Sequence, residues 1–290
     1  MKQLLILSGK GGTGKTTTAA AFISFSKAKA VADCDVDAPN LHIVKKIDAE
    51  PKSKAFIGSQ KAQIDKNLCT GCKKCLEHCR FNAIDFVDKK CEINEFACEG
   101  CGVCEYVCPQ KVVSLIDDIA GEQDLYLGDT VFSTAKLKMG RGNSGKLVTS
   151  VKKDMMFNAP EETPLAIIDG SPGIGCPVIA SVSGIDLALI VAEPSLSGIS
   201  DLERLIKTAN VLHTPIAVCI NKFNSSQQNS EKIEQFCNEN EIPFLGKIPY
   251  DKSASKAINQ GMSIAEIDCP ARDALLEVYN KVIKLLNIKN

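Results

Sequence analysis

The sequence lacks an excess of charge of either sign and lacks any long hydrophobic run. Its 34 basic residues nearly balance its 35 acidic residues, which leaves a net charge of −1. That balance argues against the broad basic surface that binds nucleic acid, so we expect no nucleic-acid partner. No apolar stretch approaches the roughly 20 residues that a membrane-spanning helix needs. Residues 1–7 are too short for a signal peptide, so we expect a cytoplasmic protein.

Fourteen cysteines stand out against this ordinary background. Nine of them fall between Cys69 and Cys108, and the other five are scattered: Cys34, Cys176, Cys219, Cys237 and Cys269. A disulfide scaffold is typical of small secreted proteins, a class that this chain does not resemble. A dense block of cysteines in a cytosolic sequence instead indicates metal binding.

The N-terminal segment carries a phosphate-binding loop. Its residues match the pattern G-x-x-x-x-G-K-S/T and are Gly9, Lys10, Gly11, Gly12, Thr13, Gly14, Lys15 and Thr16, followed by Thr17. The apolar run 4–7 predicts a buried strand before the loop, and the alanine-rich segment 17–28 predicts a helix after it. Such a loop directs backbone N–H groups at one phosphate. Lys15 would serve the β- and γ-phosphates, and the Thr16 hydroxyl would bind Mg²⁺.

Acidic residues follow two other predicted strands. The apolar run 165–168 ends in Asp169, and the strand 30–32 ends in Asp33, Asp35 and Asp37. The carboxyl ends of parallel strands form the edge where such sheets bind ligands. We therefore expect functional roles for Asp35 and Asp169, whereas turn formation or helix capping explains Asp33 and Asp37 equally well.

A predicted strand at 216–220 is followed by Asn221, Lys222, Phe223 and Asn224. A guanine-reading N-K-x-D loop would have aspartate at position 224 to accept from the guanine edge. Asparagine in that place favours ATP over GTP.

Four separated segments resemble motifs of the MinD, ParA and nitrogenase-iron-protein ATPases. The loop with its early Lys10 resembles their deviant Walker A motif, and segments 33–41 and 169–173 resemble their switch I and switch II. Segment 248–251 resembles their nucleotide-base loop. The resemblance spans residues 1–55 and 160–290.

This resemblance implies a dimer that forms when ATP binds. Its catalytic residues would be Lys10, which reaches the phosphates of the partner subunit, together with Lys15, Asp35 and Asp169. Asp35 would position the attacking water, and Asp169 would bind or orient the Mg²⁺ shell. The resemblance further implies nucleotide contacts from Gly173, Asn221, Pro249 and Asp251, with Asn221 at the adenine.

The middle of the chain contains a duplicated cysteine run, C-x₂-C-x₂-C-x₃-C. This spacing is typical of two-cluster bacterial ferredoxins, in which the fourth cysteine of each run binds the other cluster. The expected ligands of one [4Fe-4S] cluster are Cys69, Cys72, Cys75 and Cys108, and those of the second are Cys98, Cys101, Cys104 and Cys79. A pair of zinc sites is the alternative, although tetrahedral zinc needs no triplets with a distant fourth ligand. Arg80 departs from the proline expected after Cys79, and Cys91 is expected to be a spare buried thiol.

The cysteine block interrupts the nucleotide-binding segments. We predict an α/β P-loop NTPase domain over residues 1–57 and 119–290, with a mostly parallel sheet covered by helices on both faces. Residues 58–118 would form an inserted small α+β ferredoxin-like module, in which 83–87 and 112–116 pair as a small sheet. The whole architecture resembles MinD-superfamily ATPases that contain an inserted ferredoxin domain.

Alternation on both sides of segment 140–145 predicts a hairpin formed by 125–139 and 146–153. The basic residues of this region suit a solvated face better than a docking site for an acidic redox protein; they are Lys136, Lys138, Arg141, Lys146, Lys152 and Lys153. The apolar run 187–192 predicts a buried strand, and a capping box at 200–203 predicts the start of a helix.

Two features near known family sites have simpler interpretations. Cys176 follows switch II, where the nitrogenase iron protein has a cluster-binding cysteine, but a small buried residue is the favoured interpretation. The segment 274–288 predicts a packed amphipathic helix rather than a membrane anchor, because only Lys281, Lys284 and Lys289 charge its polar face.

Three functions combine these parts. The first is an ATPase that couples nucleotide-driven dimer switching to electron transfer through two [4Fe-4S] clusters. The alternatives are an iron–sulfur cluster assembly or delivery ATPase, and a redox-sensing regulatory switch. The expected partner is an unidentified redox protein or cluster acceptor.

Overall fold

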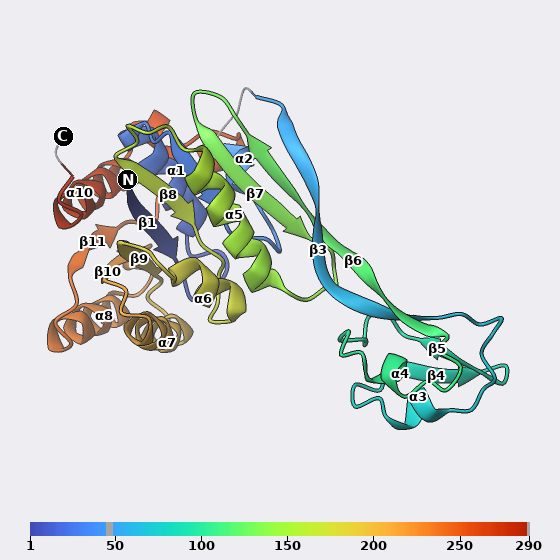
Figure 1. The fold of residues 1–290 in the computed structure, drawn as a ribbon. Coiled ribbons are helices and arrows are strands. Elements are labelled where there is room, and N and C mark those ends of the chain that lie inside the picture. Colours follow the sequence, from blue (N-terminus) through green and yellow to red (C-terminus); the bar gives the residue numbers. More distant parts are fainter. Residues whose placement is uncertain (45–48, 289–290) are drawn as a thin grey trace. The chain divides into compact units, whose positions relative to one another are not determined.

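The computed structural model describes residues 1–44 and 49–288, so Lys289 lies outside the described residues. The chain forms two compact units (Figure 1). The first contains residues 1–53, 123–136 and 144–290, and the second contains residues 54–122 and 137–143. The segment 58–118 that the cysteine spacing singles out lies within the second unit.

A nine-stranded sheet has the order β11-β10-β9-β1-β8-β2-β7-β6-β3. The strands, in chain order, are β1 (Lys2–Leu7), β2 (Ala30–Asp33), β3 (Pro51–Ile64), β6 (Val113–Tyr126), β7 (Val131–Leu137), β8 (Leu165–Asp169), β9 (Leu187–Ala192), β10 (Ile216–Asn221) and β11 (Phe244–Ile248). The neighbouring strands from β11 to β7 all pair in parallel. The apolar strands β8 and β9 are buried along their whole length, as expected for strands covered on both faces.

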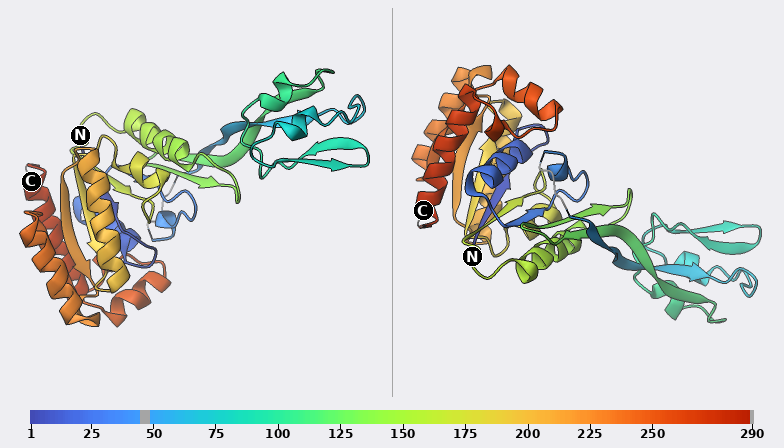
Figure 2. Two further views of the ribbon diagram at one scale, coloured as in Figure 1. Left: turned by 90° about the horizontal axis from the view of Figure 1, so that it is seen from below. Right: turned by 90° about the horizontal axis from the view of Figure 1, so that it is seen from above.

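Helices cover both faces of this sheet in the first unit (Figure 2). On one face α1 (Lys15–Ser26) packs against α10 (Pro270–Leu285), with α9 (Lys252–Asn259), α2 (Leu41–Val44) and the 3₁₀ turn η2 (Ile264–Glu266) beside them. The other face carries α5 (Ser144–Asn158), α6 (Cys176–Val182), α7 (Leu196–Val211) and α8 (Gln227–Glu239), and η1 (Phe223–Ser225) precedes α8. The predicted mostly parallel sheet with helices on both faces is therefore confirmed.

The strands β3 and β6 continue from the first unit into the second. Where the chain leaves and returns, Ser53 Oγ donates to Asp124 Oδ1 at 2.6 Å, so the two crossing points lie side by side. The turn 127–130 joins β6 to its neighbour β7, and so short a connection permits only antiparallel pairing.

The second unit is small and its core contains sulfur. It contains the hairpin β4 (Ile84–Val87) and β5 (Lys90–Ile93) and the short helices α3 (Lys74–Glu77) and α4 (Val103–Tyr106). Its buried residues include Ala62, Ile64, Ala83, Ile84 and Val113, together with Cys75, Cys91, Cys98 and Cys104. Few aliphatic side chains are buried, so cysteines make up much of the interior.

Three local predictions are wrong. The segment 144–158 is the helix α5 and not a hairpin strand, because its buried residues Leu147, Val151 and Met155 recur with the period of a helix. The strand β4 pairs with β5 and not with the segment 112–116, most of which belongs to β6. The helix α7 begins at Leu196, where Ser195 accepts from the backbone N–H of Gly198, rather than at the capping box 200–203.

The basic residues of 136–153 do not form one solvated face. The Lys152 side chain is buried and donates to the backbone carbonyls of Ala180, Ser181 and Ser183, at 3.2, 2.8 and 2.6 Å, where α6 ends. Burial lowers the pKa of Lys152. Arg141 is paired with Glu95 and Asp118 within the second unit.

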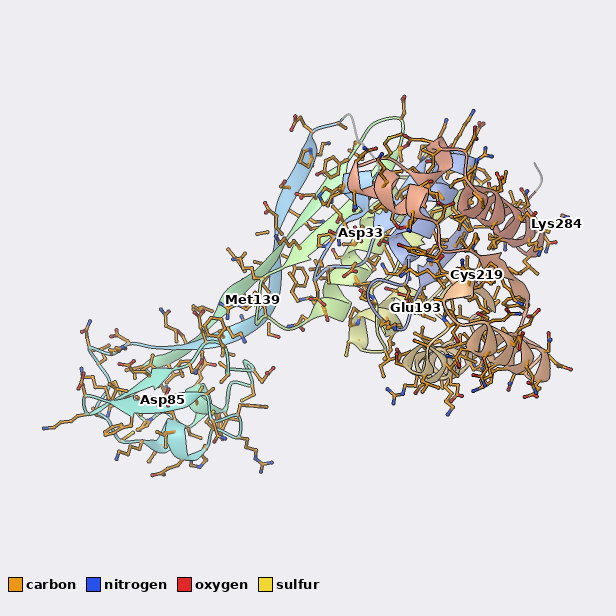
Figure 3. All side chains as sticks on the ribbon, turned by 180° about the vertical axis from the view of Figure 1, so that it is seen from behind. Asp33, Asp85, Met139, Glu193, Cys219 and Lys284 are labelled. Atoms are coloured by element: carbon orange, nitrogen blue, oxygen red, sulfur yellow. The ribbon has the colours of Figure 1, made fainter. Side chains whose placement is uncertain are left out.

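The C-terminal helix packs as predicted. On α10, Leu275, Val278 and Val282 are buried in the main core, whereas Lys284 is exposed (Figure 3). No helix in the described part of the chain is long and apolar enough to cross a membrane.

Candidate nucleotide site and cysteine cavities

The predicted nucleotide-binding residues lie at the carboxyl ends of the parallel strands. The P-loop follows β1, Asp33 ends β2, Asp169 ends β8, and Asn221 ends β10. Segments from distant parts of the sequence meet there because all these strands run in the same direction. The structure therefore brings these candidate residues to one edge of the sheet.

The P-loop needs glycine at position 14. Gly14 has φ +96°, and a Cβ atom there would lie 2.2 Å from the Asn221 amide nitrogen. Gly11 has open space around its Cβ position, so the protein itself does not fill that side of the loop. The helix α1 starts at Lys15 with no side-chain cap and no acidic residue in its first turn. Its free N–H groups and partial positive charge suit a phosphate.

The Thr13 hydroxyl also indicates a ligand site at the P-loop. Its side chain is buried, and its Oγ1 has no hydrogen-bond partner among the described residues. A buried hydroxyl without a partner is costly, so a ligand that accepts or donates here would satisfy it.

Lys15, Thr16 and Asp169 form a close group. Lys15 Nζ donates to Asp169 Oδ1 at 2.8 Å, and Thr16 Oγ1 donates to Asp169 Oδ2 at 2.7 Å. Burial alone would lower the pKa of Lys15, but the carboxylates of Asp169 and Asp35 raise it above its ordinary value. Lys15 is therefore a fixed cation, and the Thr16 hydroxyl and the Asp169 carboxylate lie beside it.

Asp33 and Asp35 have different surroundings. The fully buried carboxylate of Asp33 accepts from the backbone N–H groups of Asp35, Asn40 and Leu41 at 3.0–3.1 Å (Figure 3). It therefore shapes the segment 33–41, in agreement with the turn-forming alternative. Burial and the charge of Asp169 raise the pKa of Asp33 to about 7.

Asp35 is only partly buried, and its Oδ2 lies 3.8 Å from Lys15 Nζ. Burial raises the pKa of Asp35, and Lys15 opposes that shift. Asp35 is thus available to a ligand held by Lys15, whereas Asp37 is exposed.

Lys10 is held by a residue that sequence reasoning missed. Its Nζ lies 2.8 Å from Glu193 Oε2 and donates to Ser195 Oγ at 3.2 Å. Lys222 Nζ lies 3.5 Å from Glu193 Oε1 and donates to the Gly12 carbonyl at 2.8 Å. The hydrogen bond from Lys10 lowers the pKa of Glu193. Glu193 follows the buried strand β9, and the rule that selected Asp169 would have found it.

A cavity of about 190 Å³ adjoins the P-loop. It is lined by Gly12, Gly14, Thr17, Asn221, Pro249 and Asp251, and by apolar residues of α9 and α10 such as Ile258 and Leu275. Asn221 Nδ2 donates to the Thr13 carbonyl at 2.7 Å, so this amide supports the P-loop. Its contact with adenine stays a prediction.

The loop on the other side of this cavity is also fixed. Asn224 Oδ1 accepts from the Tyr250 N–H at 2.8 Å, and Asp251 caps α9 by accepting from the Ser253 N–H at 2.8 Å. The N–H of Gly173 donates to the Ser8 carbonyl at 3.2 Å, which places the segment after Asp169 beside the P-loop.

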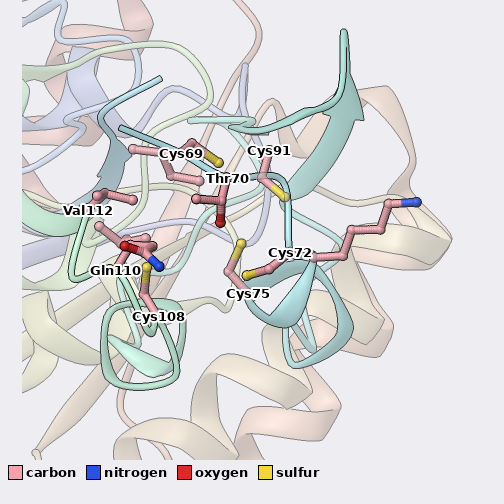
Figure 4. A pocket seen from close by; sticks show the side chains of 11 residues that line it. Cys69, Thr70, Cys72, Cys75, Cys91, Cys108, Gln110 and Val112 are labelled. Atoms are coloured by element: carbon pink, nitrogen blue, oxygen red, sulfur yellow. The ribbon is translucent and has the colours of Figure 1, made fainter. Parts of the chain in front are cut away.

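The eight predicted cluster ligands surround two cavities of the second unit. Cys69, Cys72, Cys75 and Cys108 line the first (Figure 4), and Cys79, Cys98, Cys101 and Cys104 line the second. The fourth cysteine of each run therefore lies with the first three of the other. Backbone N–H groups reach the sulfurs, from Ala62 to Cys98 Sγ and from Ala83 to Cys79 Sγ, each at 3.4 Å.

The thiols are not arranged around single ions. Among the described residues, no three cysteine, histidine, aspartate or glutamate side chains are placed to bind one metal ion. A cubane spreads its four thiolates around its corners, so it needs a wider arrangement than zinc does.

Two cysteines outside the runs differ from each other. Cys91 is buried, as predicted, but it lines the first cavity with the four expected ligands (Figure 4). Cys176 is exposed at the start of α6, so the interpretation as a small buried residue is wrong. Proline at position 177 and the Gly175 N-cap begin the helix there and leave the thiol in solvent.

Comparisons with known proteins agree with the nucleotide half of this site. Residues 4–264 match the CobQ/CobB/MinD/ParA nucleotide binding domain. An uncharacterized protein of Methanocaldococcus jannaschii is 32% identical over 97% of this chain and 96% of its own length. The iron-sulfur cluster carrier protein of Pyrococcus furiosus is 26% identical, over 99% of this chain and 88% of its own length.

A solved structure shares the fold. The septum site-determining protein MinD of Pyrococcus horikoshii, complexed with Mg-ADP, superposes with a TM-score of 0.59 at 17% identity, over 100% of this chain and 98% of that one. With the P-loop, the parallel sheet and the family match in agreement, the chain belongs to the CobQ/CobB/MinD/ParA nucleotide-binding domain family.

Proposed function

We propose that this protein is a Mg²⁺-dependent ATPase that carries two [4Fe-4S] clusters and couples nucleotide-driven dimer switching to electron transfer. The observation that carries the proposal is the sorting of eight cysteines into two sets of four around two cavities, in a chain that also contains the P-loop site. When bound, such clusters accept and donate single electrons at potentials that the surrounding protein sets.

The donor sets fit these clusters. Each cavity is lined by its four expected cysteine ligands and by apolar side chains, and the first is also lined by Cys91. In the second cavity, backbone N–H groups donate to the sulfurs of Cys98 and Cys79. The Cys91 N–H that donates to Cys69 Sγ lowers the pKa of the Cys69 thiol, which favours the thiolate that binds iron. With so few buried aliphatic residues, the second unit gains much of its stability from the groups that its cysteines bind.

The nucleotide chemistry follows from Lys15 and its neighbours. ATP would draw Lys15 from Asp169 to the β- and γ-phosphates, because the phosphates carry more charge than one carboxylate. Asp169 and the Thr16 hydroxyl would then hold Mg²⁺, which polarises the phosphate oxygens. Asp35, beside Lys15, would orient the attacking water.

Lys10 would act across a dimer. In the structure it is paired with Glu193 of its own chain. The phosphates of a partner subunit would compete with Glu193 for this lysine, so ATP would favour the dimer. Opening after hydrolysis would return Lys10 to Glu193.

The test is anaerobic purification followed by counting of iron and sulfide. We expect about eight irons per chain, ATP hydrolysis that is lost in Lys15→Ala, and an EPR-monitored reduction potential that shifts when ATP is added. If the protein contains no iron after reconstitution, or if its reduction potential does not change when ATP is added, the proposed coupling of ATP to electron transfer is contradicted.

A second candidate is an ATPase that delivers iron–sulfur clusters to other proteins. It is favoured by the similarity to the iron-sulfur cluster carrier protein of Pyrococcus furiosus. Incubation of the loaded protein with an apo-ferredoxin distinguishes the two. Transfer of clusters that depends on ATP would favour delivery, and retention of all iron would favour electron transfer.

A further inference from the structure

The two cysteine cavities differ in one respect. Among the described residues, the cysteines that line the second are its four expected ligands and no others, and its remaining walls include Phe81, Ala83, Ile84 and Ile93. The first contains five sulfurs, because Cys91 on β5 points into the hollow shared by Cys69, Cys72, Cys75 and Cys108 (Figure 4). A cubane needs four thiolates, so the first cavity has one thiol more than it requires.

Cys91 is placed at the cavity by its backbone. It pairs with Phe86 across the β4–β5 hairpin, and its N–H donates to Cys69 Sγ. Its side chain is 1% exposed, so it has little access to solvent. Its thiol is hydrogen-bonded to that of Cys75, the third cysteine of the first run. Cys91 therefore contacts two of the expected ligands, one through its backbone and one through its side chain.

We propose that Cys91 is an exchangeable fifth ligand of the first cavity, able to take the place of Cys75. This inference rests on the clusters of the proposed function. The exchange breaks the bond between one iron and Cys75 Sγ and forms a bond between the same iron and Cys91 Sγ. The proton of Cys91 passes along the hydrogen bond to Cys75. No electron is gained or lost, so the exchange requires no oxidant or reductant.

The chain offers a matched control for this exchange. Cys104 is the third cysteine of the second run, as Cys75 is of the first, and the two are buried to a similar degree, with 9% and 7% exposed. Within the part of the chain that the structure describes, no spare thiol lines the cavity of Cys104. Loss of Cys104 should therefore remove a cluster, whereas loss of Cys75 should not.

The experiment is anaerobic reconstitution of the full chain with iron and sulfide, followed by iron counting and EPR of the reduced protein. We expect about eight irons in the wild type, in Cys75→Ala and in Cys91→Ala. We expect about four in Cys104→Ala and in the double variant Cys75→Ala/Cys91→Ala. The EPR signal of Cys75→Ala should contain both clusters, with one of them altered by its new ligand.

The possible failures are distinguishable. A wild type that does not reach about eight irons contradicts the proposed clusters themselves. If the wild type holds about eight irons and Cys75→Ala holds about four, only the exchange is contradicted. If Cys75→Ala loses the iron of both cavities, it has misfolded, and Cys75→Ser replaces it as a variant of nearly equal size. If the double variant Cys75→Ser/Cys91→Ala holds about four irons fewer than Cys75→Ser, the exchange is supported. If the two variants hold equal iron, the exchange is overturned.

Discussion

Loss of the buried cation of Lys15, which lies among the carboxylates of Asp33, Asp35 and Asp169, should cost more stability than loss of one of those carboxylates. Lys15 Nζ lies 2.8 Å from Asp169 Oδ1 and 3.8 Å from Asp35 Oδ2, and the Lys15 and Asp169 side chains are 6% and 1% exposed. Breaking a buried ion pair by removing one partner costs about 3–5 kcal/mol. Asp169→Asn leaves Lys15 beside Asp35, so we expect a loss of about 3 kcal/mol. Lys15→Met leaves three carboxylates without their cation, so we expect about 5 kcal/mol.

The double variant sharpens this prediction. Burial is the largest cause of the raised pKa of Asp33, and the like charge of Asp169 adds to it, so the two carboxylates repel each other. In the Lys15→Met background, Asp169→Asn removes that repulsion and should restore about 1–2 kcal/mol. The same substitution thus destabilises one background and stabilises the other.

Native-state hydrogen exchange of the full chain without nucleotide is the suitable assay. Two compact units need not unfold together, so one global transition is an unsafe measure. Peptides that cover β1 and β8 report the opening free energy of the sheet at the site. Asp37→Asn, at an exposed acid near Asp35, is the matched control and should change nothing. A larger loss for Asp169→Asn than for Lys15→Met, or simple additivity, would refute the reasoning.

Four further outcomes are expected. The Glu193 pKa, measured by NMR, should lie below 4.5 and should rise toward that value in Lys10→Met. Lys10 stabilises the ionised carboxylate of Glu193, so the contact between the two side chains should persist at neutral pH. It should weaken as the pH falls through the lowered pKa of Glu193. Thr16→Val should weaken binding of ATP with Mg²⁺ roughly tenfold in calorimetry, about 1.4 kcal/mol, and leave metal-free binding nearly unchanged. Gly14→Ala should destabilise β1 by more than about 1 kcal/mol in hydrogen exchange, because of its positive φ, whereas Gly11→Ala should leave stability intact. Anaerobic removal of iron by a chelator should speed exchange in the second unit and spare β1 and β8; equal effects in both units would argue against a structural role for the clusters.

The position of the candidate nucleotide-binding residues in the fold could be predicted because they belong to local motifs at strand ends. Each motif can be recognised from its own residues. Because the strands are parallel, their carboxyl ends lie at one edge of the sheet, so the motifs that follow them lie there too. Glu193 was missed because a single glutamate matches no named motif, although it follows β9 as Asp169 ends β8, so the same strand-end rule would have selected it. Its role depends on where Lys10 and Lys222 reach, and only the folded chain shows that.

The errors arose where two signals compete over a short segment. Around 140–158, glycines suggested a turn and partial alternation suggested strands, yet the burial of Leu147, Val151 and Met155 on one side decided for a helix. In the cysteine block, the apolar segments 83–87 and 112–116, one after each cysteine run, suggested that these two segments pair with each other. The nearest partner, across the tight turn 88–89, formed the hairpin instead.

The hydrogen bond between Ser53 and Asp124 has a practical consequence for engineering. A host domain tolerates a guest best when the guest enters and leaves at neighbouring points. The segment 54–122, which forms most of the second unit, satisfies that condition, so a short turn joining the two positions is a rational way to build an ATPase without the cysteine block. Such a shortened chain would separate the energetics of nucleotide turnover from those of the proposed clusters.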